Sequence, residues 1–494
     1  KSWDDFSLNA AIGTSITDTR TSALRLDSKT ASLYYPNVFT IANINMSSSA
    51  YIEESDDARR QMQSFFAMAQ LGYKESLYLD VTARNDWSST LAFTERKSRG
   101  FFYPSVGLSW IIPKSFSMPS LISFGKVRAS WSKVGNDIPL FVSNTVGHIA
   151  AGGIPQPNDT APFGTLKPEM SSSFEIGTEW KFFDYRMDVD LTFYKTNTKN
   201  QLFSLPSSAG AAYKYYFVNA GNIQNMGVEL TFGAVPILTN QFKWNTTLNF
   251  SRNKNEVKKL HDDLASFIQG DEGFSSSYTM RLVEGGSFGD IYGKAFERDK
   301  YGAIVYGRDG LPQEIGSGNT AKVGNCNPAF LLGWGNSFTY KDFSFYFLID
   351  GHFGGDVLAQ TQAVLDQTGV SKVSGETRTM GYVDLEGHHI YNIKGFYEQV
   401  GGRNGVTEYY MYDATNIRLR ELSLGYTLPK RLLGRKQFLK KAELSFVARN
   451  LFFIYKKAPF DPDAVLSASN SNQGIDIFGI PTTRSVGFNV KLSF

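Results

Sequence analysis

The chain has 494 residues, with 50 Lys and Arg against 47 Asp and Glu, so its formal net charge is only +3. This balance gives no general field for nucleic acid, and the single Cys326 excludes an internal disulfide scaffold. Aromatic residues make up 14% of the chain and 45 residues are glycine, which favours strands and turns, while no apolar run is long enough for a transmembrane helix. We therefore predict an all-β protein.

Alternation of apolar and polar residues with a period of two recurs along the whole chain and predicts fourteen strands. In one of them Phe174 and Trp180 share a face, while Glu175 and Glu179 share the other. Most of the strands are ten residues or longer, a length typical of tilted membrane-crossing strands rather than of strands in soluble sandwiches. In chain order the predicted strands are 6–17, 60–72, 75–86, 103–112, 125–134, 173–182, 185–199, 225–235, 241–255, 329–340, 343–351, 416–428, 438–450 and 483–494.

The connections between these strands alternate strictly in length. Outer-membrane barrels show this asymmetry, because short periplasmic turns only reverse the chain whereas long extracellular loops recognise ligands. We therefore predict a transmembrane antiparallel β-barrel, and expect its long extracellular loops to carry local structure and function. The short connections are 73–74, 113–124, 183–184, 236–240, 341–342 and 429–437, and the long ones are 18–59, 87–102, 135–172, 200–224, 256–328, 352–415 and 451–482.

The alternation also assigns each side chain to a face, since a membrane barrel turns apolar residues to lipid and polar residues to its lumen. The residues predicted to face lipid are Phe174, Trp180, Leu191, Phe193, Trp244, Phe446 and Phe488. Those predicted to line the lumen are Glu175, Glu179, Asp188, Asp190, Lys441, Glu443 and Arg449.

One predicted strand, 416–428, changes phase along its length. Ile417 and Leu419 hold the apolar positions first, and Leu422 then takes them with the opposite parity. A β-bulge near Arg420 and Glu421 would restore the facing by inserting one residue. The alternative is that this end of the strand turns toward interior packing.

Catalytic and metal-binding patterns are weak. The G-x-S-x-G match at 285–289 would place Ser287 on a strand-to-helix elbow, but the following Asp-Ile-Tyr-Gly is not helical, so a glycine-rich loop is the better interpretation. His388 and His389 are adjacent and would point to opposite faces of an extended chain. The carboxylates Asp461, Asp463 and Asp476 lack EF-hand spacing for calcium. We predict no enzyme activity, no metal site and no cofactor.

Several short motifs, taken together and in this order, resemble one known family. They are Leu-Lys-Pro-Glu at 166–169, Phe-Glu-Ile-Gly-Thr at 174–178, Val-Asn-Ala-Gly-Asn-Ile-Gln-Asn-Met-Gly-Val-Glu-Leu at 218–230, Gly-Asp-Ile-Tyr-Gly at 289–293, Asn-Ile-Arg-Leu-Arg-Glu-Leu-Ser-Leu-Gly-Tyr-Thr-Leu-Pro at 416–429, Ala-Arg-Asn-Leu-Phe at 448–452, Phe-Asp-Pro-Asp at 460–463 and the terminal Phe494. On these residues the chain resembles the C-terminal part of the SusC/RagA-type TonB-dependent transporters of Bacteroidetes.

The resemblance implies an outer-membrane barrel of about twenty-two strands that is filled by an N-terminal plug. We expect residues 1–494 to be the C-terminal part of such a barrel, with the plug and the first strands on a missing N-terminal portion. The implied partners are a SusD-like surface lipoprotein and TonB, and the implied function is active import of glycan fragments or oligopeptides. Loops 256–328 and 352–415 are then expected to pack on the plug or on the lipoprotein lid. The alternative is an ungated outer-membrane porin or an adhesion barrel.

Two tyrosine clusters in the long loops are candidate ligand contacts. Aromatic rings beside amide and carboxylate groups suit glycans, so they favour a glycan slightly over a peptide, with packing inside the loops as the alternative for each ring. The candidates are Tyr213, Tyr215, Tyr216, Tyr409, Tyr410 and Tyr412.

Overall fold

A computed structural model describes most of the chain, which divides into two compact units. The first unit comprises Lys1–Ser115, Arg128–Glu175 and Thr196–Ile223, and the second comprises Phe116–Val127, Ile176–Lys195 and Gln224–Phe494. The described residues are 1–27, 32–45, 52–94, 100–150, 154–163, 165–207, 210–261, 264–268, 277–316, 318, 320–433, 439–465 and 472–494.

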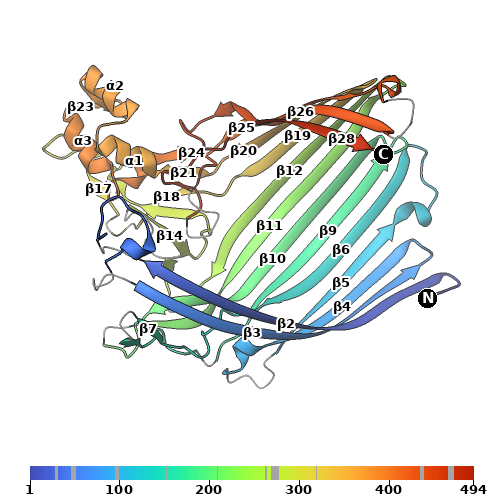
Figure 1. The fold of residues 1–494 in the computed structure, drawn as a ribbon, viewed down its shortest axis with the longest axis horizontal. Helices are drawn as coiled ribbons and strands as arrows, with labels where there is room; N and C mark the ends of the chain where they lie inside the picture. The colour runs from blue at the N-terminus through green and yellow to red at the C-terminus, as the bar shows by residue number, and fades with distance from the viewer. Residues whose placement is uncertain are drawn as a thin grey trace. The chain divides into compact units, whose positions relative to one another are not determined.

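Long antiparallel strands dominate the described residues and follow one another in the sheet in chain order (Figure 1). Each of the fourteen predicted strands is present, and the two-residue β1 Ser2–Trp3 precedes them. The others are β2 Phe6–Asp27, β3 Ile52–Tyr73, β4 Leu77–Ser88, β5 Gly100–Ile111, β6 Ile122–Asn136, β9 Glu169–Phe182, β10 Met187–Pro206, β11 Tyr215–Leu238, β12 Phe242–Lys259, β19 Phe330–Tyr340, β20 Phe343–Phe353, β25 Asn416–Thr427, β26 Lys441–Lys456 and β28 Ser485–Ser493. The predicted all-β class is confirmed.

Several strands extend further than the sequence predicted. The β2–β3 hairpin continues past the predicted 6–17 and 60–72, with Arg20 opposite Arg59 in the backbone register and the Arg59 side chain paired to Asp18 at 2.5 Å. Backbone pairing needs no apolar face, and here both faces carry polar residues, so the alternation that marks a strand disappears before the strand ends. The predicted connections 18–59 and 200–224 shorten accordingly to 28–51 and 207–214.

The phase change in β25 is a β-bulge, as one of the two interpretations proposed. Leu348 of β20 lies opposite Glu421 and Ile349 lies opposite Leu419, so Arg420 has no partner on β20. The register with β26 also shifts between Leu419 and Glu421. The extra residue turns the second half of the strand so that its apolar residues stay on the same face as those of the first half.

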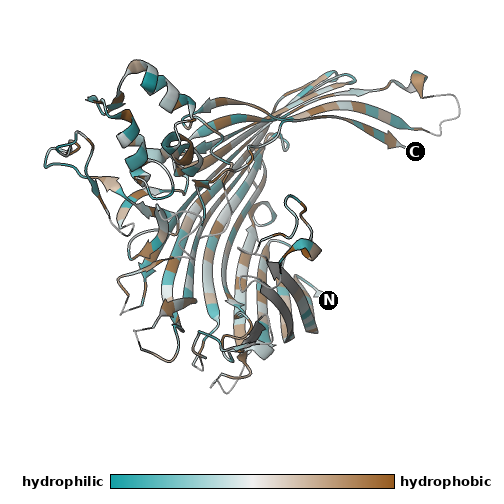
Figure 2. Cartoon of the chain, turned by 60° about the vertical axis from the view of Figure 1, so that its left-hand side comes forward, coloured by the Kyte–Doolittle hydropathy of each residue, from teal (hydrophilic) through white to brown (hydrophobic). Residues whose placement is uncertain are grey.

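One face of the strands exposes many large apolar side chains. Figure 2 shows apolar and polar residues alternating along individual strands. Phe174 and Leu191, both predicted to face lipid, are among the exposed large hydrophobics, and Phe488 is 76% exposed. So much exposed apolar surface is unfavourable in water and suits a surface that lies against lipid.

Three connections of the second unit fold together, and we call the described residues of segments 260–329, 354–415 and 457–484 the loop assembly. Figure 1 shows its helices and short strands gathered in one region. None of the helices in the described residues is long and apolar enough to cross a membrane. The elements are β13 Ser266–Ile268, β14 Tyr278–Val283, β15 Asp290–Gly293, β16 Ala295–Phe296, β17 Glu314–Ile315, β18 Ala321–Asn325, β21 Asp356–Ala359, α1 Gln360–Gln367, α2 Lys372–Met380, β22 Val383–Leu385, β23 His388–Ile390, α3 Ile393–Val400, a 3₁₀ turn at Thr407–Tyr410, β24 Met411–Asp413 and β27 Ile475–Asp476.

The loop assembly has its own hydrophobic core, to which all three connections contribute. Met280 comes from the first connection, Phe396 and Tyr410 from the second, and Ile475 from the third, and all four are at most 2% exposed. Ser277 also donates a 2.7 Å hydrogen bond to Gln360, joining the first two connections. The expectation that the long loops carry local structure is confirmed here. Burial of these side chains makes the three connections one folded body.

The first unit has a smaller core at the ends of its strands. Leu91 of the connection between β4 and β5, and Phe101 at the start of β5, pack with Ile138, Val142 and Leu166 of the connection that follows β6. Asp137 accepts hydrogen bonds from Ser88 at 2.7 Å and from Thr90 at 2.6 Å. The ends of these strands are therefore held by both apolar contacts and buried polar contacts.

Candidate functional site

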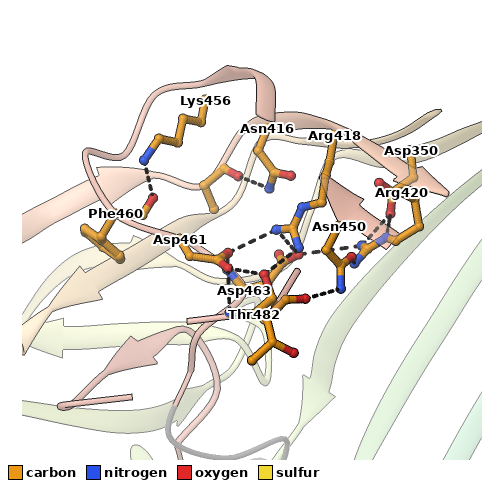
Figure 3. A network of polar contacts seen from close by, with 12 residues as sticks. Asp350, Asn416, Arg418, Arg420, Asn450, Lys456, Phe460, Asp461, Asp463 and Thr482 are labelled. Atoms are coloured by element: carbon orange, nitrogen blue, oxygen red, sulfur yellow. Dashed lines mark hydrogen bonds and ion pairs between the residues drawn. The ribbon is translucent and has the colours of Figure 1, made fainter. Parts of the chain in front are cut away.

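A buried ionic network joins β25 to the connection that follows β26 (Figure 3). The Arg418 side chain is 1% exposed, and its guanidinium donates to Asp461 at 3.0 Å and to Asp463 at 2.9 Å. It also donates to the Thr482 hydroxyl at 3.0 Å, and it lies over the Phe453 ring, 4.2 Å from the ring centre. Two of the sequence motifs, Asn416–Pro429 and Phe460–Asp463, therefore meet at this arginine.

Backbone hydrogen bonds fix the position of the Asp461 carboxylate. The backbone N–H groups of Asp463 and Thr482 each donate to its carboxylate at 3.1 Å. Burial raises the pKa of Asp461, but these hydrogen bonds, with that of the Thr482 hydroxyl and the charge of Arg418, bring it below its ordinary value. Asp461 and Asp463 therefore act as counter-ions of Arg418 in this structure rather than as a calcium site.

The bulge residue Arg420 extends the network along the strands. Its guanidinium donates twice to one oxygen of Asp350, at 2.8 and 2.5 Å, and donates to Asn450 at 3.2 Å. It also lies 3.8 Å from Asp463. The bulge thus allows Arg418 and Arg420 to share Asp463, and it brings Asp350 of β20 into the same network.

Next to this network is a cavity of about 510 Å³, which we call the first cavity. Its lining combines charged and polar residues, among them the exposed Glu229, with apolar residues such as Phe250. The buried Oδ1 of Asp350 and Nε2 of His352 have no hydrogen-bond partner in the described structure. Gly333 leaves its floor open, because a Cβ atom there would meet only Asn249, at 3.9 Å. The lining residues are Glu229, Leu230, Thr231, Asn249, Phe250, Ser251, Leu331, Leu332, Gly333, Asp350, Gly351, His352, Asn416, Arg420 and Asp463.

A second cavity, of about 470 Å³, is lined by Glu179, Lys181, Tyr185, Asp188, Val189, Asp190 and Thr231. Three of the carboxylates predicted to line the lumen therefore lie around one cavity. Thr231 belongs to the lining of both cavities and donates to Asn249 at 3.1 Å. The two cavities therefore adjoin at β11, the second extending over β9 and β10 and the first over β12, β19, β20 and β25.

The remaining residues of the predicted lumen set lie elsewhere on the strands and do not line either cavity. Glu175 lies 3.8 Å from Arg128 in the first unit. Lys441 pairs with Glu443 at 3.2 Å, and Arg449 pairs with Glu421 at 3.0 Å. Each of these carboxylates has a basic partner on its own or a neighbouring strand.

The sequence analysis named Arg420 for the bulge and Asp461 and Asp463 as calcium candidates, but it did not predict that these residues pair with one another or with Arg418 and Asp350. Glu229 alternates with Val228 and Leu230 and could have been added to the lumen set from that pattern alone. Asp350 follows the aromatic run of β20, and its pairing with Arg420 depends on the bulge. The ion-pairing role of Arg418 could not be predicted without knowing where Asp461 lies, because the two residues are 43 positions apart in the chain.

The two tyrosine clusters differ in exposure. Tyr213, Tyr215 and Tyr216 are exposed, between 40 and 45%. Tyr410 is buried in the loop-assembly core and donates to Asp366 at 3.0 Å, so for this residue the packing alternative holds and its ring faces are covered. Tyr409 and Tyr412 are partly buried against the same core.

The weaker sequence patterns have structural roles. Ser287 accepts from Asn327 at 2.7 Å in a turn that leads into β15, so the segment after it is a strand and not the helix that a nucleophile elbow requires. His388 contacts Tyr306 with the two rings tilted, and His389 stacks on Tyr382, each pair with ring centres 4.0 Å apart. Within the described part of the chain, no three His, Cys, Asp or Glu residues gather as they would around a metal ion.

Comparisons with known proteins agree with this architecture. A model of the family described as "TonB dependent receptor-like, beta-barrel" matches residues 2–451. The chain is 26% identical over 489 residues to TonB-dependent receptor P3 of Formosa agariphila, with 91% of this chain and 47% of that protein covered. It is 22% identical over 491 residues to TonB-dependent receptor SusC of Bacteroides thetaiotaomicron, with 90% and 46% covered. The chain spans about half the length of these relatives.

Among solved structures, the fold is similar to that of the RagAB peptide transporter, with a TM-score of 0.75 at 18% identity, covering 99% of this chain and 54% of that one. The closed-closed state of the RagAB peptide importer gives a TM-score of 0.76, also at 18% identity, with 100% and 54% covered. At this identity the likeness concerns the fold.

Proposed function

The chain belongs to the TonB-dependent receptor-like β-barrel family, whose members lie in the bacterial outer membrane, and from this premise we propose that it forms the C-terminal part of the barrel of an active nutrient importer. The importer takes up oligomers, either glycan fragments or oligopeptides, across the outer membrane. It works with a SusD-like surface lipoprotein as a lid and with TonB as the source of energy. No covalent chemistry is required of this chain.

The observation that carries the proposal is the loop assembly. A simple pore needs its loops only to connect strands, whereas here three connections share one core that includes Met280, Phe396 and Ile475. A folded body of this kind offers a rigid surface on which a large ligand or a lid protein can dock. We propose that loops 256–328 and 352–415 contact the plug or the lid through this assembly.

The two faces of the strands support a lumen on the polar side. Phe488 and its neighbours on the apolar face suit lipid, and the charged residues on the opposite face suit water. We propose that the lumen wall includes Glu175, Glu179, Asp188, Asp190, Lys441, Glu443 and Arg449. The plug and the first strands of the barrel would come from a preceding portion of the protein.

The substrate is proposed from its chemistry. The similarity in fold to the RagAB peptide transporter supports an oligopeptide, and the exposed rings of Tyr213, Tyr215 and Tyr216 support contacts with a glycan. Both substrates are oligomers with many hydrogen-bonding groups, and both fit a roomy cavity with mixed charges.

Purification of the natural full-length protein from native outer membranes tests the proposal. A surface lipoprotein should co-purify with it in a stable complex, and mass spectrometry of the bound small molecules should identify glycan or peptide oligomers. The same protein in planar bilayers should show no steady ion conductance, because a plug closes the barrel. Steady conductance in the absence of a lipoprotein partner would instead identify an ungated porin.

A further inference from the structure

A cavity of about 420 Å³ opens on the apolar face of the first unit, and we call it the outer cavity. Gln63 lies opposite Trp87 in the β3–β4 register, and these two residues share a face with Leu71 and Val81, which are 38 and 43% exposed. This face turns away from the lumen, so neither a plug nor further strands of the same wall would cover the cavity. Its lining residues are Gln61, Gln63, Trp87, Ser88, Ser89 and Ala92.

The outer cavity begins where the apolar band of this face ends. The outward positions of β3 are apolar from Tyr73 to Phe65 and become amides at Gln63 and Gln61. The ten positions from Tyr73 to Gln63 cover about 33 Å of strand. At a strand tilt of about 40° this corresponds to about 25 Å along the barrel axis, which is the height of the apolar band in outer-membrane barrels. Because Tyr73 adjoins a short connection, the cavity lies at the extracellular boundary of the bilayer.

The indole ring of Trp87 gives the outer cavity an aromatic wall. Gly100 lies opposite Trp87 in the β4–β5 register, and a Cβ atom at Gly100 would come within 3.0 Å of the indole ring. The absence of that atom lets the ring lie against β5, while the side chain remains 42% exposed. The next residue, Ser88, donates to the nearly buried Asp137 at 2.7 Å and so holds the strand from the other face. The ring is therefore presented on a rigid element.

Hydrogen-bonding groups of both kinds surround this ring. Ser89 accepts from the backbone N–H of Gln61 at 3.0 Å, so its own hydroxyl proton remains for a ligand. Gln63 donates to the Gln61 side chain at 3.2 Å through its amide nitrogen, which leaves its side-chain oxygen as an acceptor. That oxygen and the indole N–H of Trp87 have no hydrogen-bond partner among the described residues. The cavity thus offers two donors and one acceptor beside an aromatic face.

The charges around the outer cavity favour a neutral ligand. None of the described residues that line it is charged. The ion pair next to Gln61 on the same face, Arg59 with Asp18 at 2.5 Å, is compensated within itself. A phosphate group has only acceptor oxygens and is bound best by cations, whereas sugar hydroxyls both donate and accept. Small-molecule sites typically combine an aromatic surface with a few placed polar groups, as here.

We propose that the outer cavity binds a neutral sugar unit of a glycolipid in the outer leaflet of the membrane. The sugar ring stacks on Trp87, and its hydroxyls bond to Ser89 and Gln63. The position of the cavity favours a lipid over a soluble saccharide, because the exposed Phe65 and Phe102 lie on the same face one step closer to the membrane and would contact the acyl chains. This site is separate from the proposed import pathway and does not depend on it.

The direct test is native mass spectrometry of the natural full-length protein, purified in a polyoxyethylene detergent, whose headgroup carries no sugar. The probes are monogalactosyl-diacylglycerol and monoglucosyl-diacylglycerol, compared with diacylglycerol and phosphatidylglycerol that have the same acyl chains. At least one sugar lipid should bind at least about tenfold more tightly than both comparison lipids, because only the sugar uses the donors and the acceptor of the cavity. Galactosylglycerol, the headgroup without acyl chains, should bind much more weakly.

Substitutions at the ring locate the binding. Trp87→Leu keeps an apolar side chain but removes the aromatic surface, and it should weaken binding of the sugar lipid by at least about tenfold, as expected for a central aromatic anchor. Trp87→Phe should restore part of the affinity. Gly100→Ala should also weaken binding, since the added Cβ displaces the indole ring without removing any polar group.

Two matched controls lie on β5. Trp110→Leu removes an aromatic residue at the opposite boundary of the same face, where Trp110 lies opposite Leu77. Gly107→Ala adds a Cβ atom that would meet nothing closer than Asp80, at 3.8 Å. Both variants should bind the sugar lipid as the unmodified protein does.

The inference is overturned if neither sugar lipid binds better than diacylglycerol, if phosphatidylglycerol binds as tightly as the sugar lipids, or if Trp87→Leu binds like Trp110→Leu. Binding of galactosylglycerol as tight as that of the galactolipid would reject the lipid as the source of the sugar. The comparison of lipids on the unmodified protein decides the question even if a variant fails to fold. A surface lipoprotein that co-purifies in the same preparations supports the import proposal whichever way the lipid comparison falls.

Discussion

The guanidinium of Arg418 and the carboxylate of Asp461 form a 3.0 Å ion pair in which both side chains are almost completely covered, at 1 and 6% exposed. The pair connects a strand to a connection 43 residues further along the chain. A buried pair of this kind is held by surrounding hydrogen bonds, and loss of one partner leaves the other charge buried and uncompensated. It therefore fixes the 457–484 connection to the barrel wall.

Replacing Arg418 with methionine should lower the free energy of unfolding by about 3–5 kcal/mol, because Asp461 then remains as an unpaired buried charge. Urea titration of the purified full-length protein, followed by tryptophan fluorescence, measures the change. The matched control is Arg449→Met, which breaks the more exposed pair with Glu421 and should cost only about 0–1 kcal/mol. Equal losses in the two variants would contradict a special role for the buried pair.

The bulge at Arg420 predicts an unequal tolerance of single-residue deletions in β25. Deleting Arg420 removes the extra residue and leaves Arg418 and Glu421 on the faces that they now occupy. Deleting Ser423 instead shifts the residues on one side of the deletion by one position, so that their side chains change face. Apolar residues then lie on the polar face of the sheet. We expect the first variant to assemble in the outer membrane and the second to fail, as judged by the heat-dependent shift of the folded protein on SDS gels. Failure of both would show that the Arg420 contacts are essential.

The two faces of β28 predict unequal effects of a new charge on stability. Phe488 lies on the apolar face and packs against Phe446, with ring centres 5.7 Å apart. Phe488→Arg should destabilise the barrel by about 2–4 kcal/mol if this face meets lipid near the bilayer midplane. The neighbouring Asn489→Arg, on the other face, should change stability by less than about 0.5 kcal/mol. Folding equilibria in liposomes measure both, and the reverse order would contradict the assigned faces.

The core of the loop assembly predicts a local effect of mutation. Phe396 is completely buried in α3, and its replacement by alanine should cost about 3–5 kcal/mol of local stability. Hydrogen exchange with mass spectrometry should then show faster exchange in β14, β15 and β21 but unchanged exchange in β12 and β19. Lys394→Ala, an exposed position on the same helix, is the control and should leave every segment unchanged.

The buried Asp366 predicts that the loop assembly becomes more stable as pH falls from 7 to 5. Burial raises the pKa of this carboxyl above its ordinary 3.8, despite hydrogen bonds from Ser371, Tyr410 and Gln362. A raised pKa in the folded state stabilises the fold fully below the ordinary value, and this contribution is lost as pH rises through the folded-state value. Burial also raises the pKa values of Asp356 and Asp476 in the same assembly.

Hydrogen exchange of the loop assembly, corrected for the intrinsic rate at each pH, measures this dependence. Asp366→Asn should make it weaker, because the amide does not titrate. A loss of protection between pH 7 and pH 5 in the unmodified protein would contradict the expected sign. Asp413, Asp461 and Glu386 have lowered pKa values and act in the opposite sense, but their contribution is present above their ordinary values of 3.8, 3.8 and 4.5 and is lost mainly below pH 5.

Much of the fold could be predicted from local pattern. The fourteen strands, the sorting of short and long connections and the bulge near Arg420 all follow from the period of two, which each segment carries within itself. The strand ends could not be placed well, because the alternation fades where both faces are polar, as around Asp18 and Arg59. The prediction of Glu179, Asp188 and Asp190 as one polar set follows from the same period, and the structure gathers them around one cavity.

By itself, the amino-acid sequence of this protein determined the strands, their facing and the family resemblance, because side-chain direction in a strand depends only on position along that strand. The tertiary structure alone decided which distant residues meet. The pairing of Arg418 with Asp461, the shared core of Met280, Phe396 and Ile475, and the opening above Gly333 each need segments that are far apart in the chain. No local pattern records such contacts, since they form only when burial and ion pairing bring those segments together.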